Sequence, residues 1–181
     1  MSLPHPLHVV GIAGSPAAAS RSRALLGVAM SAAEPAGART TLVDLSVLSA
    51  DGLLARRRTP DVDAALLAVH EGHVIIAATP VYRATYTGLL KLFFDLLPPR
   101  ALAGKVALGI ATAGSAGHEG VIDHGLRPLF ASLEAIVLPA AVFATDADFT
   151  AGVPHEALVA RVRNATARAL QLCTSVVPSE E

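Results

Sequence analysis

One short loop carries the residue types that first suggest binding chemistry. It supplies three hydroxyls and a fixed positive charge, from Ser15, Ser20, Ser22 and Arg21. The apolar run that precedes it, residues 7–13, is typical of a buried strand, and the apolar periodicity of residues 24–33 is typical of a helix. Hydroxyls and backbone N–H groups at a helix start can hold an anion. The spacing therefore predicts an anion site, and an ordinary turn with a serine N-cap is the alternative.

Two common nucleotide-binding fingerprints are absent from this loop. Gly11 and Gly14 are three residues apart, and no third glycine follows at the offset that Gly-x-Gly-x-x-Gly requires. The Gly-x-x-x-x-Gly-Lys-Ser/Thr pattern of nucleoside-triphosphate loops is missing as well. The loop is better suited to a phosphate monoester held by serines, without a lysine or magnesium.

Two later loops suit a flat, conjugated ligand with a phosphate tail. Pro80 restricts the backbone of the first, and Val81, Tyr82 and Arg83 bring apolar, aromatic and cationic groups to it. The second, residues 113–117, contains only small residues. We expect the ring of such a ligand to lie between these two loops. Packing of Tyr82 on a neighbouring subunit is the alternative for that side chain.

Apolar runs rich in β-formers alternate with helical patterns along the whole chain. The predicted strands are residues 7–13, 39–45, 73–79, 105–112 and 135–144. The predicted helices are residues 24–33, 61–70, 89–97, 121–133 and 154–172. We expect Asp61 to cap the second helix and Pro154 to open the last, with a loop or a short irregular segment over residues 46–60. Pro139 is awkward inside the fifth strand and suggests an edge position or a bulge there.

This alternation predicts an α/β fold with a parallel, doubly wound sheet and helices on both faces. Ligands of such sheets bind at the carboxyl ends of the strands. The loops that follow the first, third and fourth strands are therefore expected to form one site. The length predicts a single domain over residues 1–181, with a frayed tail at about residues 175–181.

Composition narrows the class of protein further. The net charge of −1 gives no reason to expect nucleic acid or a membrane surface as a partner. The single cysteine, Cys173, excludes an intrachain disulfide and favours a cytoplasmic setting. Neither a signal peptide nor a membrane-spanning run is readable. We therefore expect a soluble, cytoplasmic protein.

Three blocks of sequence carry a resemblance to a known family. The first is Ala-Gly-Ser-Pro at residues 13–16 with Ser-Arg-Ser at 20–22, and the second spans residues 78–98 from Ala-Thr-Pro-Val-Tyr to Asp-Leu-Leu-Pro. The third is Leu-Ala-Gly-Lys-Val at residues 102–106 with Ala-Thr-Ala-Gly at 111–114. In this order the blocks resemble the NADPH-dependent FMN reductases of the flavodoxin-like fold. They are most similar to those serving two-component alkanesulfonate monooxygenases.

The resemblance implies a five-stranded parallel sheet in the order 2-1-3-4-5 and a homodimer or homotetramer. FMN would lie across a subunit edge. The residues implied to meet its phosphate are Ser15, Ser20, Arg21 and Ser22. Those implied to flank its ring are Pro80, Val81, Tyr82 and Arg83 on one side and Thr112, Ala113, Gly114 and Ser115 on the other. No catalytic acid or base is implied, because hydride passes from NADPH or NADH to the flavin by positioning alone.

The function that the resemblance implies is an NAD(P)H:FMN oxidoreductase that supplies reduced FMN to a partner monooxygenase. One alternative is a flavoprotein that retains FMN and reduces quinones, azo dyes or metal oxyanions. A non-enzymatic, flavodoxin-like electron carrier is another, which the near-neutral charge weakens. The choice between NADPH and NADH stays open, because Arg21, Arg83 and the arginines at 56–58 are each candidates to meet a 2′-phosphate.

One departure from the family pattern lies in the helix after the fourth strand. Some related reductases carry a tyrosine near the position where this chain has Asp123-His124-Gly125. A glycine beside His124 would ease a local π-bulge. The hypothesis is that this helix departs from regular α-helical hydrogen bonding between about residues 118 and 129.

Overall fold

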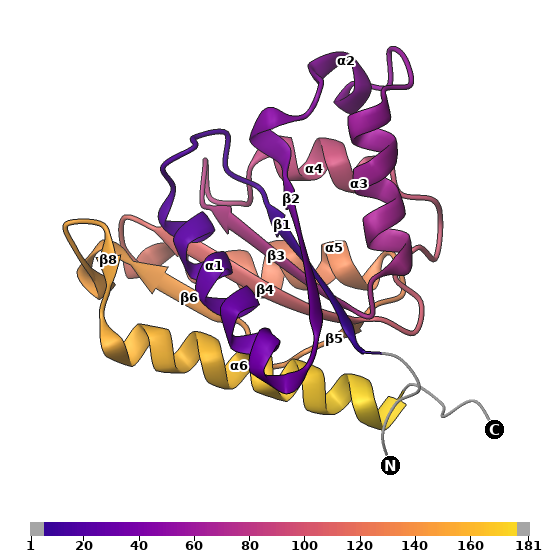
Figure 1. The fold of residues 1–181 in the computed structure, drawn as a ribbon. Coiled ribbons are helices and arrows are strands. Elements are labelled where there is room, and N and C mark those ends of the chain that lie inside the picture. Colours follow the sequence, from indigo (N-terminus) through magenta and orange to yellow (C-terminus); the bar gives the residue numbers. More distant parts are fainter. Residues whose placement is uncertain (1–5, 177–181) are drawn as a thin grey trace.

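The computed structural model describes residues 6–176 and shows a parallel β-sheet between two layers of helices (Figure 1). The strands run in the order β2-β1-β3-β4-β5, and β6 also pairs with β4. All of these pairings are parallel. The strands are β1 (His8–Ala13), β2 (Arg39–Asp44), β3 (Val74–Pro80), β4 (Val106–Ala113), β5 (Ile136–Val137) and β6 (Val142–Thr145). The predicted fold class and strand order are therefore confirmed.

Helices cover both faces of this sheet. One face is covered by α1 (Arg21–Ala33) and α6 (Glu156–Val176), and the other by α3 (Pro60–Glu71), α4 (Gly88–Asp95) and α5 (Arg127–Ala131). Short elements connect them: η1 (Glu34–Ala36), η2 (Leu45–Val47), α2 (Ala50–Leu53), η3 (Ala116–His118), η4 (Ile122–Leu126), η5 (Asp146–Asp148), β7 (Phe149–Thr150) and β8 (Val153–Pro154). No helix within residues 6–176 is both long enough and apolar enough to cross a membrane.

Strand β3 shows why the central strands read as continuous apolar runs. Ile75 and Ala77 are buried against the α3, α4 and α5 layer, whereas Val74, Ile76 and Ala78 are buried against α1 and α6. Because helices exclude water from both faces, neither set of alternating side chains can be polar. The core of the sheet is therefore specified by the same residues that mark the strands in the sequence.

The run expected as one fifth strand is divided into β5 and β6. The N–H of Leu138 still donates to the carbonyl oxygen of Ala107 in β4 at 2.9 Å, and the ladder breaks at the next residue, Pro139. The guanidinium of Arg127 donates to the carbonyl oxygens of Leu138 at 3.3 Å and Pro139 at 2.6 Å. Proline has no N–H to give to a ladder, so the strand is interrupted and a side chain satisfies the freed carbonyls. The edge irregularity expected at Pro139 is confirmed.

Three expected element boundaries are wrong. Helix α1 begins at Arg21 rather than residue 24, because its first turn carries no apolar side chain to mark it. Pro154 lies in the short antiparallel pair β7–β8, and α6 begins two residues later. Thr59, not Asp61, precedes α3, since the Asp61 carboxylate accepts from the backbone N–H of Ser49 at 2.6 Å.

The expected loop at residues 46–60 contains α2. The expected tail falls partly in α6, and residues 177–181 lie outside the described residues.

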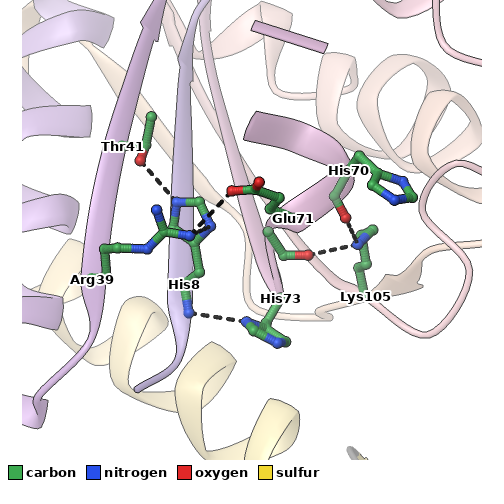
Figure 2. Close-up of polar contacts among 8 residues, drawn as sticks. His8, Arg39, Thr41, His70, Glu71, His73 and Lys105 are labelled. Carbon is green, nitrogen blue, oxygen red and sulfur yellow. Dashed lines mark hydrogen bonds and ion pairs between the residues drawn. The ribbon is translucent and has the colours of Figure 1, made fainter. Parts of the chain in front are cut away.

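A polar cluster joins the amino ends of neighbouring strands (Figure 2). The ring of His8 lies between Arg39, whose guanidinium is 2.8 Å from Nδ1, and Thr41, whose hydroxyl is 2.8 Å from Nε2. Arg39 also reaches the carboxylate of Glu71 at 3.3 Å. The backbone N–H of His8 donates to Nδ1 of His73 at 3.0 Å. These contacts connect the first residues of β1 and β2 with the segment that enters β3.

Lys105 extends the cluster to the start of β4. Its ammonium group donates to the carbonyl oxygens of His70 and Gly72, both at 2.7 Å. These carbonyls belong to the C-terminal turn of α3, where a cation is favourable. All four strands β1 to β4 are thus tied together at their amino ends.

The hydrogen bonds hold both histidines in the neutral state. A guanidinium can only donate, so Nδ1 of His8 must accept and its proton lies on Nε2. Nδ1 of His73 also accepts, from a backbone N–H. Burial lowers the pKa of His8, and the charge of Arg39 lowers it further. Burial likewise lowers the pKa of His73, with Lys105 and Arg39 as smaller causes.

We expect the free energy of unfolding to decrease as pH falls through about 6.5, the ordinary histidine pKa. The unfolded chain binds protons there that the folded cluster excludes, so the histidine contribution is complete above this pH and is lost below it. Urea denaturation at about pH 7.5 and about pH 5.5 measures the difference. The variant His73→Asn keeps an acceptor near the Nδ1 position without titrating, and should show a smaller loss. An equal loss in the variant would contradict a role for His73.

Candidate functional site

A cavity of about 350 Å³ lies at the carboxyl ends of β1, β3 and β4. Its lining comes from the three loops that the sequence singled out: Ser15, Ala17, Ala19, Ser20, Arg21, Pro80, Val81, Tyr82, Thr112, Ala113 and Gly114. Because these strands are parallel, the loops that follow them all lie at the same end of the sheet. The structure therefore brings most of the expected site residues into one cavity.

A larger cavity, of about 470 Å³, lies elsewhere, between α6 and the segment that enters β6. Alanines and the exposed side chains of Arg161, Asn164 and Arg168 line it. It contains none of the residues that follow β1, β3 or β4. We therefore place the candidate site in the smaller cavity, where three loops and a helix start converge.

Three expected site residues do not line this cavity. Ser22 is fully buried behind Ser20, and their hydroxyl oxygens are 2.8 Å apart. Arg83 is exposed in the turn that follows Tyr82, and Ser115 is exposed just beyond Gly114. Sequence reasoning in turn missed Ala17 and Ala19, which line the cavity. Their only signal is their position inside the serine-containing loop.

The start of α1 leaves room for an anion. Ser20 precedes the helix in an extended conformation, and its hydroxyl pairs with that of Ser22 instead of capping a backbone N–H. Within the described residues, no side chain caps the first turn of α1, and that turn contains no acidic residue. The first N–H groups of a helix have no partner within the helix. These groups therefore provide the donors that the anion-site prediction requires.

Arg21 is engaged by the segment that follows β6. Its guanidinium forms an ion pair with the carboxylate of Asp146, and its central carbon lies 5.6 Å from the centre of the Phe149 ring. Both ionic side chains are partly exposed, at 38% for Arg21 and 57% for Asp146. The arginine thus lines the cavity while its charge is already matched by a carboxylate.

A buried network joins the loop after β1 to the loop after β3. The hydroxyl of Thr87 donates to the carbonyl of Gly14 and accepts from the backbone N–H of Leu90 at 3.1 Å, so it also caps α4. The N–H of Thr87 donates to the hydroxyl of Thr79 at 3.1 Å. The N–H of Gly14 donates to the carbonyl of Ala78 at 2.8 Å. The relative position of the two loops is therefore fixed by hydrogen bonds from which water is excluded.

Gly14 is required by close packing in this network. A Cβ atom there would lie 3.0 Å from Leu90 Cδ1 and 3.2 Å from the carbonyl oxygen of Ala78. The second of these neighbours is backbone of a central strand. A side chain at residue 14 would therefore require β3 or α4 to shift by a few tenths of an ångström, and glycine avoids this cost.

A tight turn follows Tyr82 at the edge of the cavity. Tyr82 and Thr85 exchange backbone hydrogen bonds of 2.9 and 3.3 Å, and the two residues between them have positive φ angles, 52° at Arg83 and 69° at Ala84. Two successive positive φ angles define a type I′ turn, which glycine and asparagine normally occupy. Side chains at such positions cost free energy, and they persist where the surroundings fix the backbone.

The π-helix η4 provides those surroundings. It spans the residues where a π-bulge was hypothesised, and the hypothesis is confirmed. Gly125 in η4 lies against the turn, since a Cβ there would be 3.2 Å from Thr85 Oγ1 and 3.2 Å from Tyr86 Cδ1. The neighbouring residue in η4, His124, is exposed. The glycine thus permits close contact between η4 and the loop after β3.

Comparison with known proteins gives consistent results. Residues 7–150 match the model of the NADPH-dependent FMN reductase family. The chain is 38% identical over 174 residues to the NADH-dependent FMN reductase SfnF of Pseudomonas fluorescens, a match covering 92% of each chain. It is similar to the apo structure of the NADH:FMN oxidoreductase EMOB, with a TM-score of 0.84, 31% identity and coverage of 94% and 90%.

A more distant structure bears on the fold alone. The WrbA-like flavodoxin of Agrobacterium tumefaciens superposes with a TM-score of 0.70 at 16% identity, covering 96% of this chain and 100% of that one. The fold is therefore flavodoxin-like, as expected.

The buried network leads to a stability prediction for Thr87. Replacing it by valine removes the cap of α4 and leaves the Gly14 carbonyl without its donor, so Thr87→Val should lower the free energy of unfolding by about 1–3 kcal/mol. Thr87→Ser keeps the hydroxyl and should lose less than about 1 kcal/mol. Urea denaturation of the three proteins gives the values. Equal stability of the valine variant and the wild type would show that the hydroxyl does not hold the loops together.

Proposed function

The chain belongs to the NADPH-dependent FMN reductase family, and we propose that the cavity at the carboxyl ends of β1, β3 and β4 is its flavin site. The protein is an oxidoreductase whose cofactors and substrates are FMN and a reduced nicotinamide nucleotide. The observation that carries the assignment is the convergence of three loops on one cavity beside an uncapped helix start.

The residues of the cavity fit the two ends of FMN. For the phosphate, we propose the N–H groups that begin α1 together with the hydroxyls of Ser15 and Ser20. Ser22 supports this end through its hydroxyl contact with Ser20. For the ring, residues 80–82 and 112–114 provide two walls of small, apolar and aromatic groups. The volume falls within the range of about 300–1,000 Å³ that is usual for ligand cavities.

The lining suggests what the chain contributes to the reaction. When bound, FMN supplies the acceptor for a hydride from the nicotinamide. The cavity lining holds no carboxylate, histidine or lysine, so we propose that no side chain transfers a proton there. The contribution of the chain is to hold the two reactants face to face, which alone accounts for large rate increases.

We further propose an assembly and a partner for this activity. The ring of Tyr82 borders the cavity and is 48% exposed, which suits contact with a second copy of the chain in a homodimer or homotetramer. Reduced FMN would then leave for a flavin-dependent monooxygenase in the cytoplasm. Retention of FMN for the reduction of other acceptors is the competing arrangement, and dialysis of the FMN-loaded protein distinguishes the two.

Steady-state oxidation of NADH and NADPH at varied FMN tests the proposal. We expect turnover that depends on added FMN. Ser20→Ala should raise the half-saturating FMN concentration about tenfold, because a hydroxyl donor to an anionic phosphate is lost. The rate at saturating FMN should stay within about twofold. Ser132→Ala, in which the lost hydroxyl contacts only the Leu129 carbonyl, is the control. Absence of turnover with both nucleotides would overturn the proposal.

The structure also ranks the candidate arginines for a nucleotide 2′-phosphate. Arg21 is paired with Asp146, and the arginines at 56–58 are paired with Asp51 or Asp63. Arg83 has no ion pair within residues 6–176, and it follows Tyr82 at the edge of the cavity. We therefore propose Arg83 as the residue that meets the 2′-phosphate of NADPH.

This assignment predicts a change in nucleotide preference. Arg83→Gln should raise KM for NADPH about tenfold and leave KM for NADH within about twofold, because NADH lacks the 2′-phosphate. Arg57→Gln removes an arginine that is paired with Asp51 and does not line the cavity, and should change neither value. Equal effects of Arg83→Gln on both nucleotides would rule out a specific contact with the 2′-phosphate.

A further inference from the structure

Asp146 is placed at the candidate phosphate site by the end of β6. The last residue of that strand, Thr145, pairs in register with Ala113, which lines the cavity. The carboxylate of Asp148 accepts from the N–H of Thr145 at 2.7 Å and from its hydroxyl at 3.0 Å. This capping contact fixes the turn η5. The carboxylate of Asp146 therefore has a defined position beside the cavity.

The partner of Asp146 is the only arginine in the cavity lining, Arg21. That arginine is the first residue of α1, next to the serine hydroxyls that we assign to the phosphate. Its guanidinium is held by the Asp146 carboxylate and by the Phe149 ring, both from the segment after β6. A phosphate in this cavity meets a cation whose charge is already compensated.

We propose that Asp146 weakens the binding of the flavin phosphate and so favours the release of FMN. The inference rests on the proposed function, in which the phosphate lies at the start of α1. The carboxylate acts in two ways: it withdraws the charge of Arg21, and its own negative charge repels a phosphate dianion. The site then holds the phosphate through N–H groups and hydroxyls, and FMN behaves as a substrate that exchanges.

A purely structural role for the ion pair makes a different prediction. As a clamp between η5 and α1, the pair would support the ring and the phosphate ends of the cavity equally. Its partial exposure argues against a large contribution to stability, because exposed ion pairs are weakly stabilising. Riboflavin, which has the ring and ribityl chain of FMN without the phosphate, separates the two roles.

The test compares the dissociation constants of FMN and riboflavin for the full-length protein, measured by quenching of flavin fluorescence without nucleotide. Asp146→Asn keeps the shape of the side chain and removes its charge. We expect the FMN dissociation constant to fall about three- to tenfold, and that of riboflavin to stay within about twofold. Asp146→Ser provides a second neutral variant. Thermal melts followed by circular dichroism verify that each variant is folded.

Three further variants test the effect of removing a distant negative charge, of removing Arg21, and of removing Arg21 and the Asp146 charge together. Glu134→Gln removes one negative charge from an exposed pair with Arg100, at the amino end of β5 and not at the carboxyl end of β6, and should change neither dissociation constant. Arg21→Met should weaken FMN binding. The double variant Arg21→Met with Asp146→Asn should lie between the two single variants, because both charges are removed together.

The outcomes separate this inference from the proposed function. An FMN dissociation constant that is unchanged or raised in Asp146→Asn overturns the inference alone. Parallel changes for FMN and riboflavin also overturn it, in favour of a structural clamp. If the wild-type protein binds neither flavin, the proposed function fails, and the inference fails with it.

Discussion

The hydroxyl of Thr87 is the contact on which the shape of the candidate site depends. It accepts from the backbone N–H of Leu90 and so caps α4, and it donates to the carbonyl of Gly14, 73 residues earlier in the chain. The first and third strands bring these residues close, but parallel pairing alone does not fix the loops beyond the strand ends. The buried hydroxyl of Thr87, which both donates and accepts, fixes the position of these loops. The loops after β1 and β3 are thereby held together as one unit.

Most of the fold could be predicted because burial on both faces leaves a clear signal. Strand β3 is apolar from Val74 to Ala78, with Thr79 as a buried, hydrogen-bonded exception at its carboxyl end, and the alternation of strands with helices then limits the topology. The errors fall where local signals conflict with tertiary contacts. Pro154 suits a helix start, but it lies in the β7–β8 pair. The first turn of α1 carries Arg21, Ser22 and Arg23 and no large apolar side chain, so apolar periodicity could not reveal it.

The sequence allowed the loops of the candidate site to be predicted, but not the positions and partners of their individual side chains. Small residues after β1 and β4 and the Pro-Val-Tyr-Arg segment after β3 marked the cavity, and the glycine beside His124 marked the π-helix. The sequence could not show that Ser22 points away from the cavity behind Ser20. Nor could it pair Arg21 with Asp146, since 125 residues separate them and the contact exists only after folding. Charge partners of this kind depend on the tertiary structure.

The polar cluster at the amino ends of β1 to β4 has a consequence for how such a chain can diversify. It links the amino ends of the strands, opposite the cavity at their carboxyl ends, through His8, Arg39, His73 and Lys105 (Figure 2). The loops at the carboxyl ends of the strands therefore contribute less to holding the strands together. Substitutions in those loops that spare the contact between Thr87 and Gly14 can alter ligand preference while the strands stay in place. New ligand specificities can therefore arise by substitution at the carboxyl ends of the strands while the cluster at the amino ends preserves the sheet.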